Sequence, residues 1–398
     1  MKKNVSKSKF DDVLKSLRKV KDDMTLASDV EQKTRRKRKI RRNNTIGSAN
    51  VPSETGKLSI GIVGIGSIGT TVAVLLASNG YDVEITKKNT DALTIDNCVN
   101  LEINGAFGDK SYLVPYVENN NFTTKKDIII MCTQSFSTAG ALSDVKRYLK
   151  PTGIVVSMQN VLNINEVLSE IPKEKYIPLV VDWTATRIEQ NHVLVIRKAD
   201  MHIGCFDDKA KVFLPVVKKL LDCIQPTIIE EDIMSFIASR FVLNCTLSCV
   251  LAITGHKLKH TMLRKSAKNL VLGTISEMLE VFEAYGIKVP PYCDTLDYYL
   301  LTKKGIRGWF YRQQVFNSFI RKNGDMSSSI LRALENKKKT ELDSLCARVV
   351  EMAKEKNIEV PFNETISNFL YDVEAGNETI FMENLNNPCF TSLKIKWR

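Results

Sequence analysis

Apolar and polar residues follow one another along residues 58–208 in short blocks that predict strands and helices in turn. The run LSIGIV at 58–63 and the run Tyr81–Ile85 are the first two strand candidates. Four more runs of strand length follow, at Ile128–Met131, Ile154–Met158, Ile177–Val181 and Val193–Ile196, with helical segments such as Ala139–Leu149 and Asn165–Ile171 between them. This alternation predicts an α/β domain with a parallel sheet, and Val193–Ile196 with Met201–Gly204 predicts a closing antiparallel hairpin.

From about residue 209 the apolar positions recur at intervals of three and four residues, which predicts helices. The segments are Lys211–Cys223, Ile233–Thr254, Arg264–Tyr285, Lys337–Glu355 and Asn363–Ala375. We therefore expect three parts: a tail at 1–56, an α/β domain at 57–208 and an all-helical C-terminal domain at 209–398.

Three glycines follow the first strand at the spacing GxGxxG, and a helix-forming segment, TTVAVLLASNG, comes directly after them. In such a turn the first glycine permits the tight bend, the second lets a pyrophosphate approach the backbone, and the third lets the helix pack on the strand. The free N–H groups of the helix start then bind the phosphates. The pattern predicts a Rossmann domain whose dinucleotide contacts are Gly64, Ile65, Gly66, Ser67, Ile68 and Gly69.

Lys87 and Lys88 follow the second strand, where a site for NAD usually offers an acidic residue to the ribose. Glu84 lies inside that strand and is expected on the wrong face. A basic pair suits a 2′-phosphate, so NADP is the predicted cofactor. The alternative is that Lys87 and Lys88 belong to a solvated turn.

The composition limits the other classes of site. Nine cysteines are scattered without a CxxC pair, and the four histidines stand at 192, 202, 256 and 260. No metal site is predicted, and His256 and His260, four residues apart, are expected to have surface or packing roles. No run reaches the roughly 20 apolar residues of a membrane span. Without a signal peptide, a reduced, cytoplasmic location is expected.

Most of the positive charge lies in the tail. Residues 1–57 carry 17 Lys and Arg against 7 Asp and Glu, which is +10 of the chain's +12. The run Lys33–Arg42 (KTRRKRKIRR) could contact a polyanion such as nucleic acid, act as a nuclear address, lie on an anionic surface, or belong to a solubilising arm. Before it, apolar residues from Phe10 to Val20 recur at helical spacing and predict a short amphipathic helix.

Three further motifs occur in order along the chain. They are Gln159-Asn160 after a strand, Arg240-Phe241-Val242-Leu243-Asn244 on the first long helix, and Ser329 with Glu335-Asn336 and Thr340-Glu341-Leu342-Asp343. With the glycine motif they resemble the ketopantoate reductase family over nearly all of residues 58–398. The resemblance implies an NADP-dependent reductase of a small 2-oxo acid, such as 2-dehydropantoate in pantothenate biosynthesis. It also implies a helical domain like the C-terminal domain of 6-phosphogluconate dehydrogenase, with a homodimer as one possible assembly.

The resemblance also implies roles for single residues. Arg240 takes the place of the catalytic residue, Asn244, Ser248 and Ser329 bind the substrate, and Cys132, Asn160 and Glu341 serve the cofactor or order the catalytic cation. Arg240, Asn244 and Ser248 follow one another at i, i+4 and i+8, so they share one helix face. That face offers a cation, an amide and a hydroxyl to one small anion.

The chain departs from the family pattern at several positions. Arg240 replaces a lysine, and arginine stays charged where lysine can lose a proton, so Arg240 is a poor general acid. Other replacements are Val161 for a glycine, Cys132 for a lysine, Ser248 for an asparagine and Cys346-Ala347 for Asn-Gly. The alternative to a reductase is a non-catalytic NADP-binding relative that uses its basic tail for partners. An opine-type dehydrogenase is a third hypothesis, disfavoured by the lack of a plausible catalytic histidine.

The segment Thr302–Met326 is longer than the family pattern leads us to expect. It mixes aromatic residues such as Trp309 and Phe310 with basic residues such as Arg307 and Arg312. A lid, a dimer surface, a nucleic-acid contact and ordinary packing all remain open for it.

Overall fold

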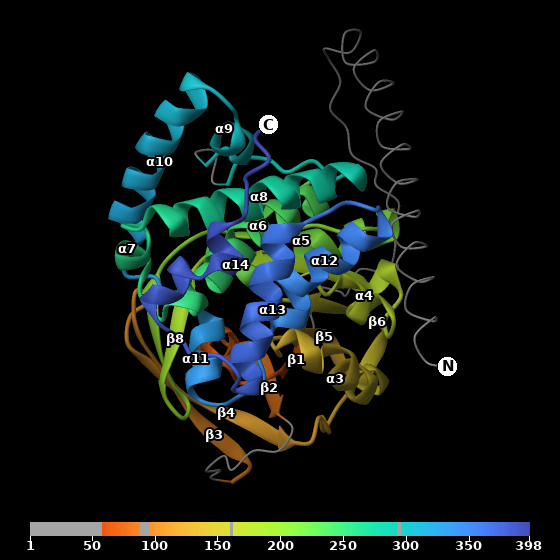
Figure 1. The fold of residues 1–398 in the computed structure, drawn as a ribbon. Helices are drawn as coiled ribbons and strands as arrows, with labels where there is room; N and C mark the ends of the chain where they lie inside the picture. The colour runs from red at the N-terminus through yellow and green to blue at the C-terminus, as the bar shows by residue number, and fades with distance from the viewer. Residues whose placement is uncertain (1–57, 88–95, 160–161, 293–295) are drawn as a thin grey trace, which may run out of the picture. The chain divides into compact units, whose positions relative to one another are not determined.

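The computed structural model describes residues 58–87, 96–159, 162–292 and 296–398 (Figure 1). The chain divides into two compact units, with the main division between Ile233 and Met234 and with Leu162 grouped in the second unit. The first unit therefore continues past the expected boundary at residue 208. It includes α5 (Leu214–Asp222) and β11 (Thr227–Ile229) in addition to the α/β segment.

The first unit is built on one sheet, which has eleven strands in the described residues, in the order β11-β10-β7-β6-β5-β1-β2-β4-β3-β9-β8. The strands not yet given are β1 Ser59–Val63, β2 Asp82–Lys87, β3 Cys98–Gly105, β4 Lys110–Glu118, β5 Lys126–Met131, β6 Leu149–Ser157, β7 Tyr176–Val181, β8 Thr184–Glu189, β9 His192–Arg197 and β10 Met201–Ile203. The helices are α2 Ser67–Ser78, α3 Thr138–Val145, α4 Ile164–Leu168 and α5.

The six central strands, β4-β2-β1-β5-β6-β7, are all parallel to their neighbours. Numbered in chain order they run 3-2-1-4-5-6, which is the arrangement of the Rossmann fold. The predicted parallel sheet and Rossmann domain are confirmed for these strands. Because parallel strands end at the same edge, the carboxyl ends of β1, β2, β5 and β6 share one edge of the sheet.

The outer strands make the sheet mixed, which the sequence analysis missed. Strand β3 pairs antiparallel with β4, and β10 pairs antiparallel with β7. The predicted hairpin of Val193–Ile196 with Met201–Gly204 is wrong. Strand β9 instead pairs antiparallel with β8 and parallel with β3. The chain reverses between β8 and β9 at Asn191, whose φ of 65° is the left-handed conformation that asparagine tolerates in turns.

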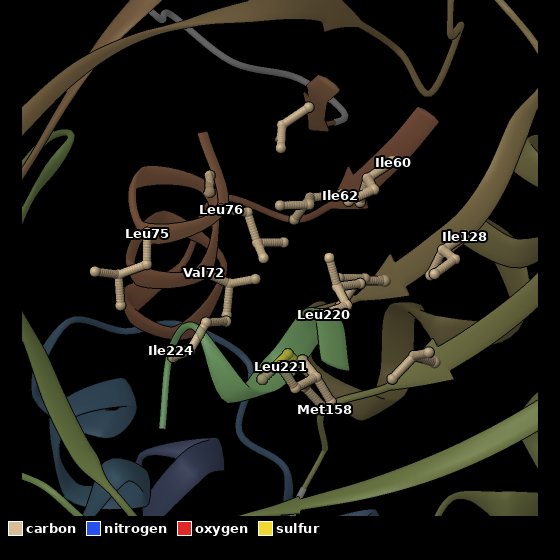
Figure 2. Close-up of a cluster of buried hydrophobic side chains, with 14 of the residues drawn as sticks. Ile60, Ile62, Val72, Leu75, Leu76, Ile128, Met158, Leu220, Leu221 and Ile224 are labelled. Carbon is tan, nitrogen blue, oxygen red and sulfur yellow. The ribbon is translucent and has the colours of Figure 1, made fainter. Parts of the chain in front are cut away.

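One hydrophobic core cluster of the first unit lies on one face of the sheet (Figure 2). Ile128 and Ile130 of β5 belong to it, whereas Ile129 between them does not, as the two-residue period of a strand requires. Helix α2 contributes Val72, Leu75 and Leu76, and α5 with the turn after it contributes Leu220, Leu221 and Ile224. Helices α2 and α5 therefore cover the same face.

The second unit is helical, as predicted. Its helices are α6 Ile233–Thr254, α7 Leu258–Thr261, α8 Lys265–Ala284, α9 Tyr298–Thr302, α10 Ile306–Asn323, α11 Ser329–Glu335, α12 Cys346–Glu355, α13 Pro361–Ala375 and α14 Pro388–Thr391. Helix α6 is central to the unit. Its Phe241 packs edge-on against Phe282 of α8, with ring centroids 6.0 Å apart, and its Ser239 carbonyl accepts a hydrogen bond of 2.7 Å from the Tyr298 hydroxyl of α9.

Helix α6 corrects the expectation that no segment is long and apolar enough to span a membrane. Its 22 residues have a mean hydropathy of 1.8 in the most apolar window, the one such helix found in the described residues. However, 83% of that window is buried inside the protein. A central helix of a folded core passes the same length and hydropathy test, so the finding is weak support for a membrane span.

Two segments of the second unit add to the prediction from sequence. The helix expected over Lys337–Glu355 begins only at Cys346, because Lys337 has a φ of 50° and the segment before α12 holds a separate turn at Leu342–Ser344 and a non-helical Leu345, with φ −119° and ψ −117°. The aromatic and basic segment Thr302–Met326 forms α10, on which Ile306, Trp309 and Phe310 are exposed.

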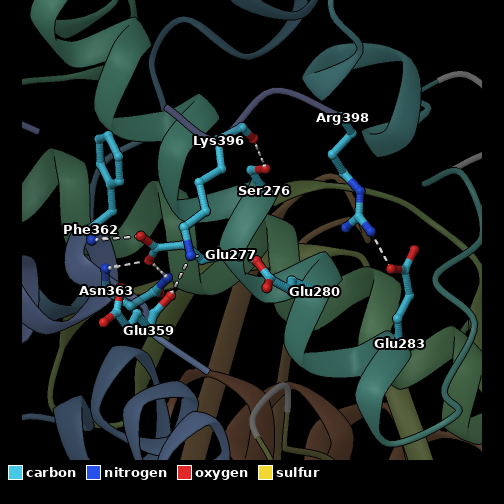
Figure 3. Close-up of polar contacts among 9 residues, drawn as sticks. All are labelled: Ser276, Glu277, Glu280, Glu283, Glu359, Phe362, Asn363, Lys396 and Arg398. Carbon is cyan, nitrogen blue, oxygen red and sulfur yellow. Dashed lines mark hydrogen bonds and ion pairs between the residues drawn. The ribbon is translucent and has the colours of Figure 1, made fainter. Parts of the chain in front are cut away.

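The C-terminal residues of the chain run along α8 (Figure 3). The Ser276 hydroxyl donates a hydrogen bond of 2.5 Å to the Lys396 carbonyl, and Arg398 forms an ion pair with Glu283. On the same helix the buried Glu277 carboxylate accepts hydrogen bonds from the backbone N–H groups of Phe362 and Asn363, at 2.8 and 2.9 Å. Polar contacts thus join α8 to the start of α13 and to the C-terminus.

Candidate functional site

The glycine motif forms the turn between β1 and α2, as predicted. Gly64 has a φ of 96°, and its N–H donates a hydrogen bond of 2.8 Å to the Thr86 carbonyl of β2. Gly69 lies so close to this turn that a Cβ there would come within 1.9 Å of the Gly64 carbonyl oxygen. Gly64 and Gly69 are therefore required by the fold itself.

Gly66 differs from the other two glycines. A Cβ on Gly66 would have no protein atom within 4 Å, and its φ of −76° does not call for glycine. The open space lies at the N-cap of α2, a helix with no acidic residue in its first turn and no side-chain cap. The N–H groups and the dipole at this end attract an anion. The space beside Gly66 fits the pyrophosphate of a dinucleotide.

Three side chains hold the turn in place. Thr70 donates a hydrogen bond of 3.4 Å to the Ile65 carbonyl, and Arg187 of β8 donates to the same oxygen. The Thr71 hydroxyl donates a bond of 2.8 Å to the Ser67 carbonyl in the first turn of α2. These contacts fix the backbone of Ile65 and Ser67, whereas Ile68 is partly buried against the hydrophobic core.

The second strand ends at Lys87, which is partly exposed at the edge of the sheet where Gly64 lies. Lys88 lies outside the described residues. Glu84 is withdrawn from this edge, because its buried carboxylate forms an ion pair of 2.6 Å with the buried Lys126 ammonium and accepts a hydrogen bond from the Thr123 N–H. The expectation that Glu84 faces away from the ribose agrees with this pairing.

Cys132 and Gln159 follow β5 and β6 at the same edge. The Cys132 N–H donates a bond of 2.8 Å to the Val63 carbonyl, and burial raises the pKa of its thiol to about 12, so the sulfur stays protonated. The Gln159 amide donates bonds of 2.7 Å to the Thr133 carbonyl and 2.6 Å to the Thr138 hydroxyl. Gln159 thus ties together the ends of β5 and β6. Asn160 and Val161, which follow it, lie outside the described residues.

In the second unit Arg240, Asn244 and Ser248 stand on successive turns of α6. The Arg240 guanidinium lies over the ring of Tyr292, 5.6 Å from its centroid. The Ser248 hydroxyl donates a hydrogen bond of 3.2 Å to the Asn244 side-chain oxygen. The predicted row of a cation, an amide and a hydroxyl is therefore present on one helix face.

The start of α11 is attached to this row. The buried Ser328 hydroxyl donates a hydrogen bond of 2.6 Å to the Ser248 carbonyl and accepts one of 3.1 Å from the Leu331 N–H, which makes Ser328 the N-cap of α11. Ser329, the predicted substrate residue, is exposed and one residue from this contact. Glu341 is farther along the chain and precedes the short turn Leu342–Ser344, where its carbonyl accepts a bond of 2.9 Å from Ser344.

His256 and His260, for which surface or packing roles were expected, are both exposed. Their rings lie edge-on, 6.4 Å apart, at an open cavity of about 780 Å³ in the second unit. The His256 ring also contacts the Thr254 carbonyl at 2.6 Å.

Both units match sequence models of one family. The model described as "Ketopantoate reductase PanE/ApbA" matches residues 60–208, and its companion for the C-terminal part matches residues 232–374. The two matches cover most of the chain. The chain belongs to the ketopantoate reductase family. The fold predicted from the motifs is thereby confirmed in both parts.

Relatives and solved structures agree with this assignment. The chain is 23% identical to the 2-dehydropantoate 2-reductase of Aquifex aeolicus over 79% of this chain and 97% of that protein. It is 23% identical to the Pyrococcus abyssi enzyme of the same name, over 80% and 98%. A ketopantoate reductase structure from Ralstonia eutropha matches with a TM-score of 0.69 at 18% identity, over 81% of this chain and 100% of that one. A D-mandelate dehydrogenase with NADH matches with the same TM-score at 16% identity, over 80% and 99%.

The structure also brings together residues that the sequence analysis left scattered. The thiols of Cys245, Cys249 and Cys346 lie within 4.8 Å of one another, buried in the second unit. The spacing of Cys245 and Cys249, four residues apart on a predicted helix, was the one sequence signal for this cluster. The basic run 33–42 and the amphipathic pattern before it lie outside the described residues.

Proposed function

We propose that this member of the ketopantoate reductase family reduces a small 2-oxo acid with a nicotinamide dinucleotide, and that NADPH is its preferred donor. The observation that carries the proposal is the row formed by Arg240, Asn244 and Ser248 on α6. Three polar groups of different kinds, a guanidinium, an amide and a hydroxyl, follow one another along one helix face. A 2-oxo acid offers a carboxylate and a ketone oxygen that match such donors.

The first unit would hold the cofactor. Gly66 leaves open space at the N-terminus of α2 for a pyrophosphate, and Lys87, with Lys88 beside it in the sequence, offers charge to a 2′-phosphate. By their places after β5 and β6, Cys132 and Asn160 would border the nicotinamide half. When bound, the cofactor supplies a hydride to the ketone carbon. The D-mandelate dehydrogenase of the same fold was solved with NADH, which is why the preference for NADPH needs its own test.

The second unit would hold the oxo acid. Arg240 would stabilise the negative charge that develops on the ketone oxygen, because a fixed cation favours a growing alkoxide. Since arginine holds its proton, the proton that completes the alcohol would come from water. The Ser248 hydroxyl donates a hydrogen bond of 3.2 Å to the Asn244 side-chain oxygen, so the Asn244 amide is partly oriented before substrate arrives. Ser329 at the start of α11 would bind the substrate, and Glu341 would order the cation or contact the cofactor.

The test is NADPH oxidation by the full chain against a panel of 2-oxo acids that includes 2-dehydropantoate. We expect turnover with at least one member, and faster turnover with NADPH than with NADH. No turnover with any member, in a protein that binds NADPH, would contradict the reductase proposal. Replacing Lys87 and Lys88 with Ala should weaken NADPH binding more than NADH binding. An equal loss for both cofactors would mean that these lysines do not distinguish them.

A second candidate function is that of an NADP-binding relative without catalysis. The replacement of the family lysine by Arg240 favours it, because arginine is a poor general acid. In that case the basic run 33–42 would serve a polyanion or protein partner. Deleting residues 1–56 should then leave nucleotide binding intact and remove most salt-sensitive binding to polyanions. The same affinity and salt dependence in the truncated chain would contradict a role for the tail.

A further inference from the structure

Three cysteines meet in the core of the second unit, from two helices far apart in the sequence. Cys245 and Cys249 lie one turn apart on α6, and Cys346 is the first residue of α12. The Cys346 sulfur is 3.4 Å from that of Cys245 and 3.3 Å from that of Cys249. All three side chains are 0% exposed.

The cluster is separate from the row proposed to bind the oxo acid. Cys245 and Cys249 each follow a member of that row by one residue, Asn244 and Ser248, and one residue turns a helix by about 100°. The two sets therefore occupy different faces of α6.

The chemistry of the three groups is that of a thiophilic metal site. Cysteine sulfurs bind soft ions such as Cu(I) and borderline ions such as Zn(II). A structural zinc site takes four ligands, and among the described residues no fourth His, Cys, Asp or Glu joins the three sulfurs. Complete burial also leaves the sulfurs without the solvent contact through which a water could enter as the fourth ligand. Three sulfurs alone suit an ion that accepts trigonal coordination.

The distances favour a metal over a disulfide. Three sulfurs around an ion at about 2.3 Å would stand about 4.0 Å apart, so the present contacts need to open by about 0.6 Å. A disulfide at about 2.05 Å would require two sulfurs to close by about 1.3 Å. The present sulfur positions are therefore closer to those of three metal ligands than to those of a disulfide.

The start of α12 contributes a helix dipole at Cys346, whereas the nearby Glu277 carboxylate acts against a thiolate there. Cys346 stands at the first position of the ten-residue helix α12, whose first turn contains no acidic residue. The dipole of that helix stabilises a thiolate at its start. The Cys346 sulfur contacts both other sulfurs. The helix dipole therefore acts on the sulfur that the two contacts share.

We propose that Cys245, Cys249 and Cys346 form a buried trigonal binding site for Cu(I). Binding would form three copper–sulfur bonds and release the protons that the thiols carry to solvent. No electron is transferred, because the ion enters as Cu(I).

The test is an anaerobic titration of the full chain with Cu(I), in the absence of nucleotide and with bicinchoninate as the competing chelator. We expect one tightly held Cu(I) per chain, protons released in a weakly buffered solution, and X-ray absorption that shows three sulfur neighbours at about 2.3 Å. Cys346→Ala should weaken binding by more than about 100-fold, beyond the usual cost of an outer-shell change. Cys389→Ala, which removes an exposed cysteine, should leave binding unchanged.

Three results would overturn the proposal. They are Cu(I) binding that survives Cys346→Ala, tighter binding of Zn(II) than of Cu(I) to the three cysteines, and a disulfide within the cluster of the anaerobically purified protein. Should Cys346→Ala fail to fold, as judged by circular dichroism, the wild-type protein still decides. Fewer than three sulfur neighbours, or no bound copper against the chelator, would exclude the site.

Discussion

The Ser328 hydroxyl donates a hydrogen bond of 2.6 Å to the carbonyl oxygen of Ser248, and so attaches the start of α11 to the middle of α6. The same hydroxyl caps α11 by accepting a bond from the Leu331 N–H. One buried side chain thus connects the helix that carries the predicted substrate row with the helix that begins at Ser329. Ser328 both positions and caps α11, which leaves the exposed Ser329 hydroxyl available for binding the substrate.

Neighbouring serines should therefore give opposite results. Ser328→Ala removes the N-cap and the bond to α6, and should lower the free energy of unfolding by about 1–2 kcal/mol. Ser329→Ala should change stability by no more than about 0.5 kcal/mol, as surface changes usually do, and should raise KM for the oxo acid. Urea unfolding and steady-state kinetics of both variants measure the two effects. A stability loss confined to Ser329→Ala would contradict the division of roles.

The glycine motif contains a matched pair for separating folding from binding. Gly66→Val projects into open space, so the fold should persist while nucleotide binding is lost. Gly69→Ala places a Cβ within 1.9 Å of the Gly64 carbonyl oxygen and should destabilise the first unit by at least about 1–3 kcal/mol. Calorimetry with NADPH and thermal unfolding follow the two variants. Unchanged affinity in Gly66→Val would remove the cofactor assignment.

Local patterns explain why the central sheet and the glycine turn could be predicted from the sequence. β1, the turn at Gly64 and α2 are contiguous, and the alternating burial of residues such as Ile128 and Ile130 is visible as apolar runs. The helix Ile233–Thr254 also has the predicted bounds. The boundary at Lys337 failed because the left-handed Lys337 and the non-helical Leu345 interrupt a periodic pattern, and periodicity carries no signal for either.

Contacts between distant residues could not be predicted in the same way. Cys245 and Cys346 are 101 residues apart. The outer strands of the sheet also pair with strands that are distant in the sequence, such as β3 with β9. Strand β9 is an example, because the segment before it and the segment after it in the sequence were both candidates for its antiparallel partner. The strand before it, β8, is the one it pairs with, and β8 has exposed positions that weaken its apolar signal.

The buried ion pair of Glu84 and Lys126 gives a prediction about stability rather than cofactor choice. Both side chains are less than a tenth exposed, and their charged groups lie 2.6 Å apart. Lys126→Met would leave the carboxylate buried without its partner and should cost about 3–5 kcal/mol. The double variant Glu84→Gln with Lys126→Met should recover part of that loss. Denaturant unfolding tests this, and no recovery in the double variant would argue against the pair as the cause.

Glu84→Gln provides the functional control for the same pair. Because the Glu84 carboxylate is engaged inside the fold, its replacement should leave the ratio of NADPH to NADH affinity unchanged. A shift of that ratio toward NADPH would mean that Glu84 contacts the ribose after all.

Glu277 should make the stability of the protein depend on pH. Burial raises the pKa of its carboxyl to about 7, against the lowering effect of the N–H groups of Phe362 and Asn363, the Asn363 amide and the charge of Lys396 (Figure 3). Between the ordinary value of 4.5 and about 7, the folded protein binds a proton that the unfolded chain has lost. This group's contribution to the free energy of unfolding should therefore fall as pH rises through that window, by up to about 1.4 kcal/mol per pH unit, and level off above it.

Glu277→Gln isolates that contribution. The amide turns its own N–H group toward the backbone donors at 362 and 363, so the variant should be less stable by about 1–3 kcal/mol near neutral pH. Its stability deficit should be largest below about pH 5, where the wild type gains from protonation, and should shrink toward pH 7. Urea midpoints from pH 4.5 to 8 measure the difference. A deficit that does not vary with pH would show that Glu277 does not titrate in this range.

Arg240 is the position on which the proposed reaction depends. Its guanidinium lies over the Tyr292 ring, 5.6 Å from the centroid, which holds the cation at a defined place on α6. Arg240→Ala should lower kcat/KM by roughly 100- to 1,000-fold, the effect of losing one preorganised donor to a developing oxyanion. Arg240→Lys restores the family residue and is the sharper variant. In a reductase adapted to arginine it should also lower the rate, because a point charge replaces a planar fork with several donors.

The pH profile separates the two candidate functions. With Arg240 as a fixed cation, the wild-type rate should show no ionisation from this position between pH 6 and about 9, whereas the lysine variant should gain one if its ammonium delivers the proton. A non-catalytic relative would behave differently: the wild type would be inactive, and Arg240→Lys could gain reduction of 2-dehydropantoate. If both variants equal an active wild type in rate and pH profile, Arg240 takes no part in the reaction and the transfer of the family's catalytic position to this residue is wrong.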